Sequence, residues 1–274
     1  MSETSNESDA QSLIRPDGAV AFETAGAGPL IVCVPGMGDL RASYRFLTPQ
    51  LVAAGFRVAT MDLRGHGDSD TSFVDYGDEP TAGVIVALIA ELGGPAIVVG
   101  NSMSAGSAVI AAAKRPELIS GLVLVGPFVR DHGPAIKRTV LRVIMARAWA
   151  AASWKSYLPK LYAGTKPTDF TAYRDAVAAA IKRPGYAKAF SLTTRTRHAA
   201  AEAALPMVGA PSLIVMGELD PDFSDPSAEA RWIADQLRGD VLMVAEAGHY
   251  PQSQRPELVG SAIASFAHSA ASHA

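Results

Sequence analysis

Ser102 is the residue of this 274-residue chain whose surroundings point most directly to chemistry. It follows a short apolar run, residues 95–100, and precedes an alanine-rich stretch with helical character. That order predicts a strand, a sharp turn and a helix, which leaves the serine hydroxyl clear of both elements and aims helix N–H groups at its target. Ser102 is therefore a candidate nucleophile for acyl transfer.

Small residues flank Ser102 where a tight strand-to-helix turn has least room. Gly100 lies two residues before it and Ser104 two residues after it, so the segment reads G-N-S-M-S instead of G-x-S-x-G. Ser104 is the rival nucleophile, but that assignment moves the serine into the helix and away from the strand end. A serine that only caps a helix is the structural alternative, and partners elsewhere in the chain must decide.

A serine hydroxyl is a weak nucleophile at neutral pH and needs a general base. His249 lies on a short loop between an apolar run, residues 241–244, and the last helical stretch. From there its side chain can reach the carboxyl ends of parallel strands, so we expect it to be the base. The other histidines lie in the C-terminal region, in or beside a long intermediate segment, or in a turn: His268, His273, His132, His198 and His66.

The base in turn needs an orienting carboxylate on another strand end. Asp220 closes the run 213–220, between the serine and the histidine in chain order, and is our candidate. Acids are common at strand ends for capping and solubility, so four rivals stay open: Glu218, Asp222, Asp225 and, more distantly, Asp131.

Acyl transfer places negative charge on the former carbonyl oxygen, which preorganised N–H groups stabilise. We assign one donor to the backbone of Met103, directly after the serine, and a second to Met37, in a glycine-rich turn after residues 30–34. These glycines could instead cradle a phosphate, but the P-loop Lys-Ser/Thr and the G-x-G-x-x-G spacing are missing. We expect no cofactor and, without a Cys/His cluster at zinc spacing, no metal.

The elements that must position these residues follow from the apolar pattern. Short β-branched runs alternate with helical stretches, which is typical of an α/β fold with a mostly parallel sheet and helices on both faces. The predicted strands are 20–24, 30–34, 57–61, 96–100, 122–125, 213–216 and 241–244. The predicted helices are 44–54, 81–92, 103–114, 228–237 and 257–267.

The alternation stops after residue 125 and resumes near residue 213. We expect a helical cap at 129–205, inserted into a core formed by 13–128 and 206–268, after a disordered N-terminal tail at 1–12. Between residues 130 and 204 fourteen Lys/Arg face four Asp/Glu, a charge of +10 in a chain of net charge −3. Such a cap can attract anionic substrates, or simply pack on an acidic core with its long stems over apolar neighbours.

Composition excludes several classes of protein. The chain is 49% hydrophobic, enough for a large core, and its net charge of −3 offers no general basic field for nucleic acid. No apolar run approaches the roughly twenty residues that span a bilayer, and the first ten residues lack a signal-peptide pattern. Cys33 is the single cysteine, in an apolar run, which predicts a buried side chain and a cytoplasmic protein.

Five short segments, in order, resemble the α/β-hydrolase fold family: 34–38 (VPGMG), 62–69 (DLRGHGDS), 100–104 (GNSMS), 217–220 (GELD) and 247–251 (AGHYP). The resemblance implies a triad of Ser102, Asp220 and His249 in that family's chain order. It also makes 62–69 a structural loop, so His66 is not catalytic. Two positions depart from the pattern, because Pro35 stands where many relatives have histidine and Ser104 where they have glycine.

The resemblance also narrows the reaction. Haloalkane dehalogenases and related epoxide hydrolases carry aspartate at the elbow, so Ser102 argues against both. We expect hydrolysis of a carboxylic ester or lactone of a small molecule, with an anionic substrate as the functional reading of the basic cap. A C–C bond hydrolase, a cofactor-free haloperoxidase or perhydrolase, and a hydrolase-like ligand receptor or signalling partner stay open, as does the oligomeric state.

Overall fold

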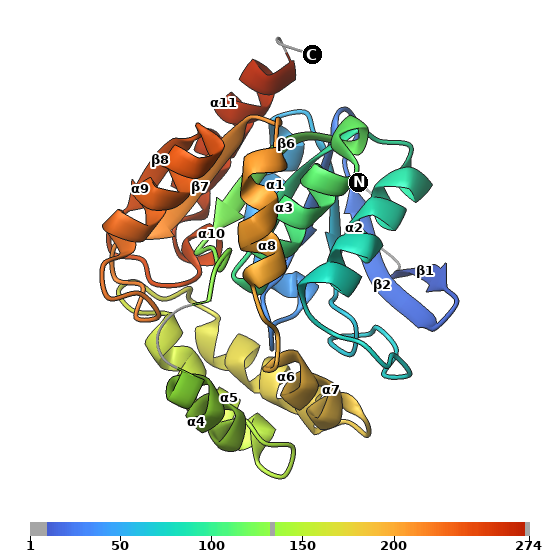
Figure 1. Ribbon diagram of the computed structural model, residues 1–274, viewed down its shortest axis with the longest axis vertical. Coiled ribbons are helices and arrows are strands. Elements are labelled where there is room, and N and C mark those ends of the chain that lie inside the picture. The colour runs from blue at the N-terminus through green and yellow to red at the C-terminus, as the bar shows by residue number, and fades with distance from the viewer. Residues whose placement is uncertain (1–9, 132–134, 272–274) are drawn as a thin grey trace, which may run out of the picture.

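An eight-stranded sheet forms the centre of the molecule. The computed structural model describes residues 10–131 and 135–271 (Figure 1). The strands are ordered β1-β2-β4-β3-β5-β6-β7-β8, with β1 and β2 antiparallel and all others parallel. Their bounds are β1 Gln11–Arg15, β2 Gly18–Ala25, β3 Leu30–Val34, β4 Arg57–Met61, β5 Ala96–Asn101, β6 Ile119–Val125, β7 Ser212–Gly217 and β8 Asp240–Val244.

Helices cover both faces of this sheet. On one face α1 (Leu47–Ala53) and α11 (Pro256–Ala271) pack against Ile31, Val99 and Val215. On the other face α2 (Asp78–Leu92), α3 (Met103–Lys114) and α9 (Pro226–Leu237) pack against Val32, Val98 and Ile214. Alternate residues of the buried strands thus enter two separate cores, because successive side chains point to opposite faces. The predicted α/β class is confirmed.

The segment between β6 and β7 holds five helices. They are α4 Ala135–Ile144, α5 Ala150–Leu161, α6 Phe170–Lys182, α7 Tyr186–Thr193 and α8 Ala199–Ala204. The helices α4 to α7 lie together beyond one end of the sheet, whereas α8 returns alongside α3 (Figure 1). An aromatic cluster of their own, including Trp154, Tyr173 and Phe190, holds the outer helices together. We call the segment α4–α7 the cap.

Each of the seven predicted strands and five predicted helices corresponds to an observed element. The predicted tail at 1–12 was too long, since β1 begins at Gln11 and was not foreseen. This edge strand pairs with β2 from Gln11↔Phe22 onward and buries little beyond Leu13, so its apolar signal is weak. Residues 1–9 of that tail lie outside the described residues.

Short elements complete the described part of the chain. Three are 3-10 turns, η1 Arg41–Tyr44, η2 Pro116–Leu118 and η3 Leu205–Met207, and one is a single helical turn, α10 Pro251–Gln254.

Cys33 is fully buried in β3, as its apolar run predicts. Within the described residues, no helix combines the length and the apolarity that a bilayer crossing requires.

Candidate active site

The carboxyl ends of β3 and β5 bring two predicted site segments together. These strands are adjacent in the sheet although β4 intervenes in the chain, because the order of the strands reverses here. Open α/β sheets bind ligands at such a reversal of strand order. A Cβ atom on Gly36, in the turn after β3, would lie only 2.8 Å from the Cβ of Ser102. Glycine therefore lets the Met37 turn approach the serine.

Ser102 occupies a strained turn between β5 and α3. Its φ of 58° and ψ of −125° are unusual for a residue with a side chain, and such strain is typical of functional positions. Its N–H donates to the Val125 carbonyl at 2.9 Å, and its own carbonyl accepts from the Phe128 N–H at 3.1 Å. Gly100 is required here, because a Cβ on it would lie 2.5 Å from the Ser104 carbonyl oxygen.

The two departures from the family pattern contact each other. Ser104 is fully buried, and its hydroxyl donates to the carbonyl of Pro35 at 2.6 Å. The helix after the nucleophile is thereby bonded to the turn that carries Met37. The Ser104 hydroxyl is engaged in structure, which weakens its case as the nucleophile.

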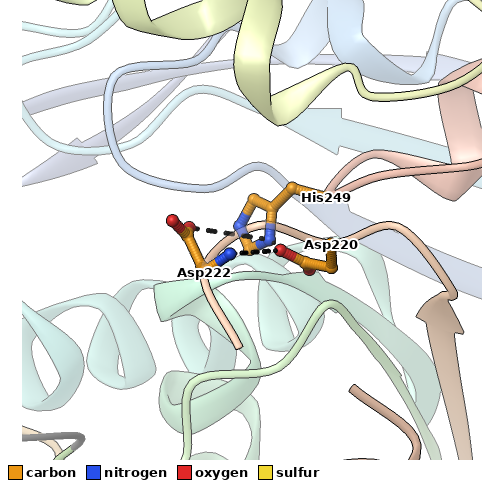
Figure 2. A group of neighbouring side chains, drawn as sticks. All are labelled: Asp220, Asp222 and His249. Carbon is orange, nitrogen blue, oxygen red and sulfur yellow. Dashed lines mark hydrogen bonds and ion pairs between the residues drawn. The ribbon is translucent and has the colours of Figure 1, made fainter. Parts of the chain in front are cut away.

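His249 and Asp220 form a buried hydrogen-bonded pair (Figure 2). The imidazole Nδ1 lies 2.7 Å from the Asp220 Oδ2, and the two side chains are 2% and 0% exposed. The other Asp220 oxygen accepts the backbone N–H of Asp222 at 3.0 Å. Because a carboxylate oxygen accepts this bond, the hydrogen of the neutral imidazole lies on Nδ1, and in that form Nε2 keeps a free lone pair.

The carboxylates around His249 favour its charged form. Burial alone lowers the pKa of the imidazole, but the charge and hydrogen bond of Asp220, followed by the charge of Asp222, outweigh it. The net result is a pKa above the usual 6.5. An imidazole in this position is a stronger base than a free one.

Three of the four rival acids have surroundings typical of structural or surface carboxylates. Glu218 is exposed, and Asp225 caps α9 by accepting the Ala228 N–H at 2.9 Å. Asp131 pairs with Arg197 at 2.6 Å. Each therefore fits the capping or solubility role expected of strand-end acids.

Asp222 is the rival that stays close to the pair. Its Oδ2 lies 3.9 Å from His249 Nδ1, beyond hydrogen-bond distance, while its Oδ1 accepts the Tyr157 hydroxyl of α5 at 2.7 Å (Figure 2). Burial raises the pKa of this carboxyl, against the charge of His249. Asp222 therefore acts on His249 through its charge and links the pair to the cap.

The other described histidines differ in their surroundings. His66 is buried with Nδ1 bonded to the Arg64 carbonyl, and burial lowers its pKa to about 4, consistent with a structural loop. His268 packs against Phe56. His198 pairs with Asp78. His132 and His273 lie outside the described residues.

Met37 and Met103 both line the cavity that contains Ser102. Within residues 10–131 and 135–271, neither backbone N–H takes part in a hydrogen bond. The two residues that carry these N–H groups therefore line the cavity of the strained serine, one at a helix N-terminus and one in a glycine-rich turn.

Sequence reasoning missed the groups that fix the His249 loop. The His249 N–H donates to the Leu161 carbonyl of α5 at 2.7 Å, and the Asn101 amide donates to the His249 carbonyl at 3.2 Å. Gln254 joins the Gly248 N–H to the carbonyl of Ala163. Asn101 lies inside the recognised elbow motif, but nothing in the sequence marks Leu161 or Gln254 as partners.

A cavity of about 550 Å³ holds Ser102 and His249. Its walls come from the core loops, through Met37, Phe128 and Phe223, and from the cap, through Trp154 and Tyr157. A larger hollow of about 900 Å³ lies near Arg41, Asp62 and Arg183, and its lining lacks these groups. The smaller cavity is the candidate active site because it alone of the two holds the nucleophile.

Asp220, Asp222 and His249 are also a set of possible metal ligands. Their ligand atoms lie within 4.8 Å of one another. The Nδ1 atom that a cation would bind is already hydrogen-bonded to Asp220, and the other carboxylate, Asp222, accepts the Tyr157 hydroxyl. The geometry fits a polarised imidazole better than a metal centre.

Known proteins resemble the chain over most of its length. Residues 31–262 match the model of the alpha/beta hydrolase family. The 2-(acetamidomethylene)succinate hydrolase of Mesorhizobium japonicum is 30% identical over 256 residues, 88% of each chain. An esterase from Thermogutta terrifontis has a TM-score of 0.80 at 24% identity, covering 95% of this chain and 99% of the esterase. A bromoperoxidase from Bacillus anthracis scores 0.81 at 18% identity, covering 92% and 96%. The chain therefore belongs to the alpha/beta hydrolase family.

Proposed function

We propose that this protein hydrolyses a carboxylic ester or lactone of a small molecule, with Ser102 as nucleophile, His249 as base and Asp220 as orienting acid. The observation that carries the proposal is that His249, which lines one cavity with the strained Ser102, lies 2.7 Å from Asp220. Ser102, Asp220 and His249 follow the ends of three different strands, β5, β7 and β8, and a serine triad needs three groups brought together in this way, whatever the fold that supplies them.

In the first half-reaction, Nε2 of His249 takes the Ser102 proton while the hydroxyl oxygen attacks the acyl carbon. Asp220 stabilises the imidazolium that forms. The imidazolium then gives this proton to the leaving alkoxide, the carbon–oxygen bond breaks, and the acyl group remains on Ser102. In the second half-reaction water repeats the sequence, which releases the acid and restores the serine.

The Met37 and Met103 amides hold the tetrahedral oxyanion in this mechanism. Their unengaged N–H groups support the assignment, as does the Ser104 hydroxyl bonded to the Pro35 carbonyl. That bond fixes the Met37 turn relative to α3, so the two donors keep their spacing as charge develops. Preorganised donors of this kind contribute about 10²–10³ in rate each.

The cavity size favours a small substrate, since about 550 Å³ falls within the range of small-molecule sites. Basic residues near the cap have acidic partners on the core. Arg130 bonds Glu229 and Arg183 bonds Asp68. These pairs support the interpretation that the basic segment packs on an acidic core. The succinate in the name of the Mesorhizobium relative carries carboxylates, which favours the alternative of an anionic substrate. Paired anionic and neutral esters, measured at low and high salt, separate the two readings.

The decisive test is hydrolysis of a panel of p-nitrophenyl esters and lactones by the wild type and Ser102→Ala. We expect turnover by the wild type and a loss of about 10⁴–10⁶-fold in kcat in the variant. Ser104→Ala is the matched control and retains the reaction. Equal rates for the wild type and Ser102→Ala on every compound would reject the proposal in favour of a C–C hydrolase or a receptor.

Labelling with a fluorophosphonate probe identifies the nucleophile directly. We expect mass spectrometry to locate the label on the peptide at Ser102 in the wild type and in Ser104→Ala. A label on Ser104 would overturn the assignment. Adding hydrogen peroxide, acetate, bromide and an acceptor that can be brominated tests the perhydrolase alternative, because the peracid formed from acetate oxidises bromide to the brominating species.

A further inference from the structure

A second histidine–carboxylate pair lies beside the same cavity, and its histidine, His198, lines that cavity. His198, the residue before α8, places Nδ1 at 2.8 Å from Oδ2 of Asp78, the first residue of α2. The side chains are 13% and 2% exposed, so this is no surface ion pair. Nothing in the proposed mechanism uses it.

The surrounding structure makes room for this pair. A Cβ on Gly106 of α3 would lie 2.9 Å from the Asp78 carboxylate and 2.8 Å from the Phe128 carbonyl, so any larger residue would displace one of them. Burial raises the pKa of Asp78, and the hydrogen bond and charge of His198 oppose this. A buried carboxylate is costly unless it is paired, and His198 supplies the partner.

The two histidines flank one aromatic ring. Phe128 stacks on His198 with centroids 5.7 Å apart and meets His249 edge-on at 5.9 Å. Phe128, His198 and His249 all line the cavity of Ser102. A substrate whose carbonyl lies at Ser102 can therefore extend across Phe128 toward His198.

The contacts of His198 leave one ring nitrogen for a ligand. Nδ1 faces Asp78, and the backbone N–H of His198 donates to Asp131 at 3.2 Å, which fixes the residue at both points. Among the described residues, no group bonds to Nε2. Three threonines in the same wall donate their hydroxyl hydrogens to backbone carbonyls: Thr193, Thr194 and Thr196.

We infer that His198, held by Asp78, is a specificity-determining residue whose Nε2 hydrogen-bonds an oxygen on the substrate tail, either a hydroxyl or a carboxylate. The inference rests on the proposed function, because it assumes that the scissile carbonyl lies at Ser102. It adds to that function a polar subsite across Phe128, so the preferred esters carry an oxygen group remote from the reacting carbon.

Two amide substitutions separate this role from a purely structural one. In His198→Asn the amide nitrogen replaces Nδ1 and keeps the bond to Asp78, but nothing replaces Nε2. In His198→Gln the amide nitrogen replaces Nε2 and the bond to Asp78 is lost. The substrates are p-nitrophenyl hexanoate, its ω-hydroxy analogue and the half-ester of adipic acid, which share one chain length.

We expect His198→Asn to lower the preference in kcat/KM for an oxygen-bearing ester over the hexanoate by about tenfold, mainly through KM. His198→Gln should keep more of that preference and lose thermal stability. If His198→Asn lowers the preference for the hydroxyl ester alone, the wild-type His198 ring binds its substrate in the neutral form. If it lowers the preference for the carboxylate ester alone, the ring binds as an imidazolium. An unchanged preference in His198→Asn, or an equal loss on all three esters, would overturn the inference.

Calorimetry on the Ser102→Ala protein gives a readout that needs no turnover. The ligands are hexanoate, its ω-hydroxy analogue and adipate, with and without His198→Asn. We expect the oxygen-bearing ligands to lose about tenfold in affinity and hexanoate to change less. If the wild type hydrolyses no ester but this difference persists, the subsite stands and the proposed function fails. Equal changes for the three ligands would reject the subsite alone.

Discussion

The chain builds the same hydrogen bond twice, each time from a histidine that lines the cavity of Ser102 to a buried aspartate, but in different surroundings. His249–Asp220 joins the loops after β8 and β7, at 2.7 Å, whereas His198–Asp78 joins the return from the cap to the start of α2, at 2.8 Å. The first pair is nearly sealed from solvent and has a second carboxylate, Asp222, at 3.9 Å. The second pair is more open and stacks on Phe128.

The difference shows that a histidine–carboxylate bond alone does not identify a base. The His249 loop is bonded directly to the nucleophile's strand, through the Asn101 amide, and to the cap, through the Leu161 carbonyl. His198 lies across Phe128 from that centre. We therefore assign proton transfer to the first pair and recognition to the second.

Removing one carboxylate from each pair should have the largest effect on this contrast. Asp220→Asn is expected to lower kcat on a simple alkyl ester by about 10³–10⁴-fold, because His249 loses its orienting charge and its correct tautomer. The matched Asp78→Asn should cost less than tenfold on the same ester. Steady-state kinetics check both, and similar losses would remove the distinction between the pairs.

The pH profile should separate the pairs next. His249 must be neutral to accept the Ser102 proton, and its pKa is raised above 6.5 by Asp220 and Asp222 despite burial. Wild-type kcat/KM should therefore increase with pH, with the midpoint of this acid limb above pH 6.5. In Asp220→Asn that limb should move to lower pH, since the main stabiliser of the imidazolium is gone. A limb that stays in place would assign the titration to another group.

Asp222→Asn should have a smaller effect than Asp220→Asn. Its carboxylate acts on His249 by charge at 3.9 Å, without a hydrogen bond. We expect a loss of less than tenfold in kcat and a small shift of the acid limb to lower pH, measured in the same profile. A larger loss than in Asp220→Asn would transfer the orienting role to Asp222.

Ser104→Ala should give the smallest effect on activity and a measurable one on stability. The substitution leaves the buried Pro35 carbonyl without its partner, which costs about 1–3 kcal/mol in the free energy of unfolding. Urea denaturation checks this value, with Ser261→Ala, at an exposed position of α11, as the control. Because the bond also positions the Met37 turn, kcat should decrease several-fold. Unchanged stability would show that another group satisfies the carbonyl.

Much of the fold could be predicted from local pattern. Buried strands are continuous apolar runs, such as β3 and β5, and some helix boundaries carry breaker or capping residues, as Asp225 and Pro226 do at α9. The edge strand β1 escaped because it buries little beyond Leu13. Edge pairing depends on the neighbouring strand, which the local sequence does not describe.

The sequence by itself determined the order of the chemical groups: a serine after one strand, an acid after another, a histidine after the last, and glycines where backbones meet. Motifs carry this information because tight turns accept few residue types. Only the tertiary structure decided which acid contacts His249, that Ser104 bonds Pro35, and that His198, in the wall of the cavity, pairs with a buried Asp78. Those contacts join residues up to 120 positions apart, and chain topology, not local preference, sets such distances.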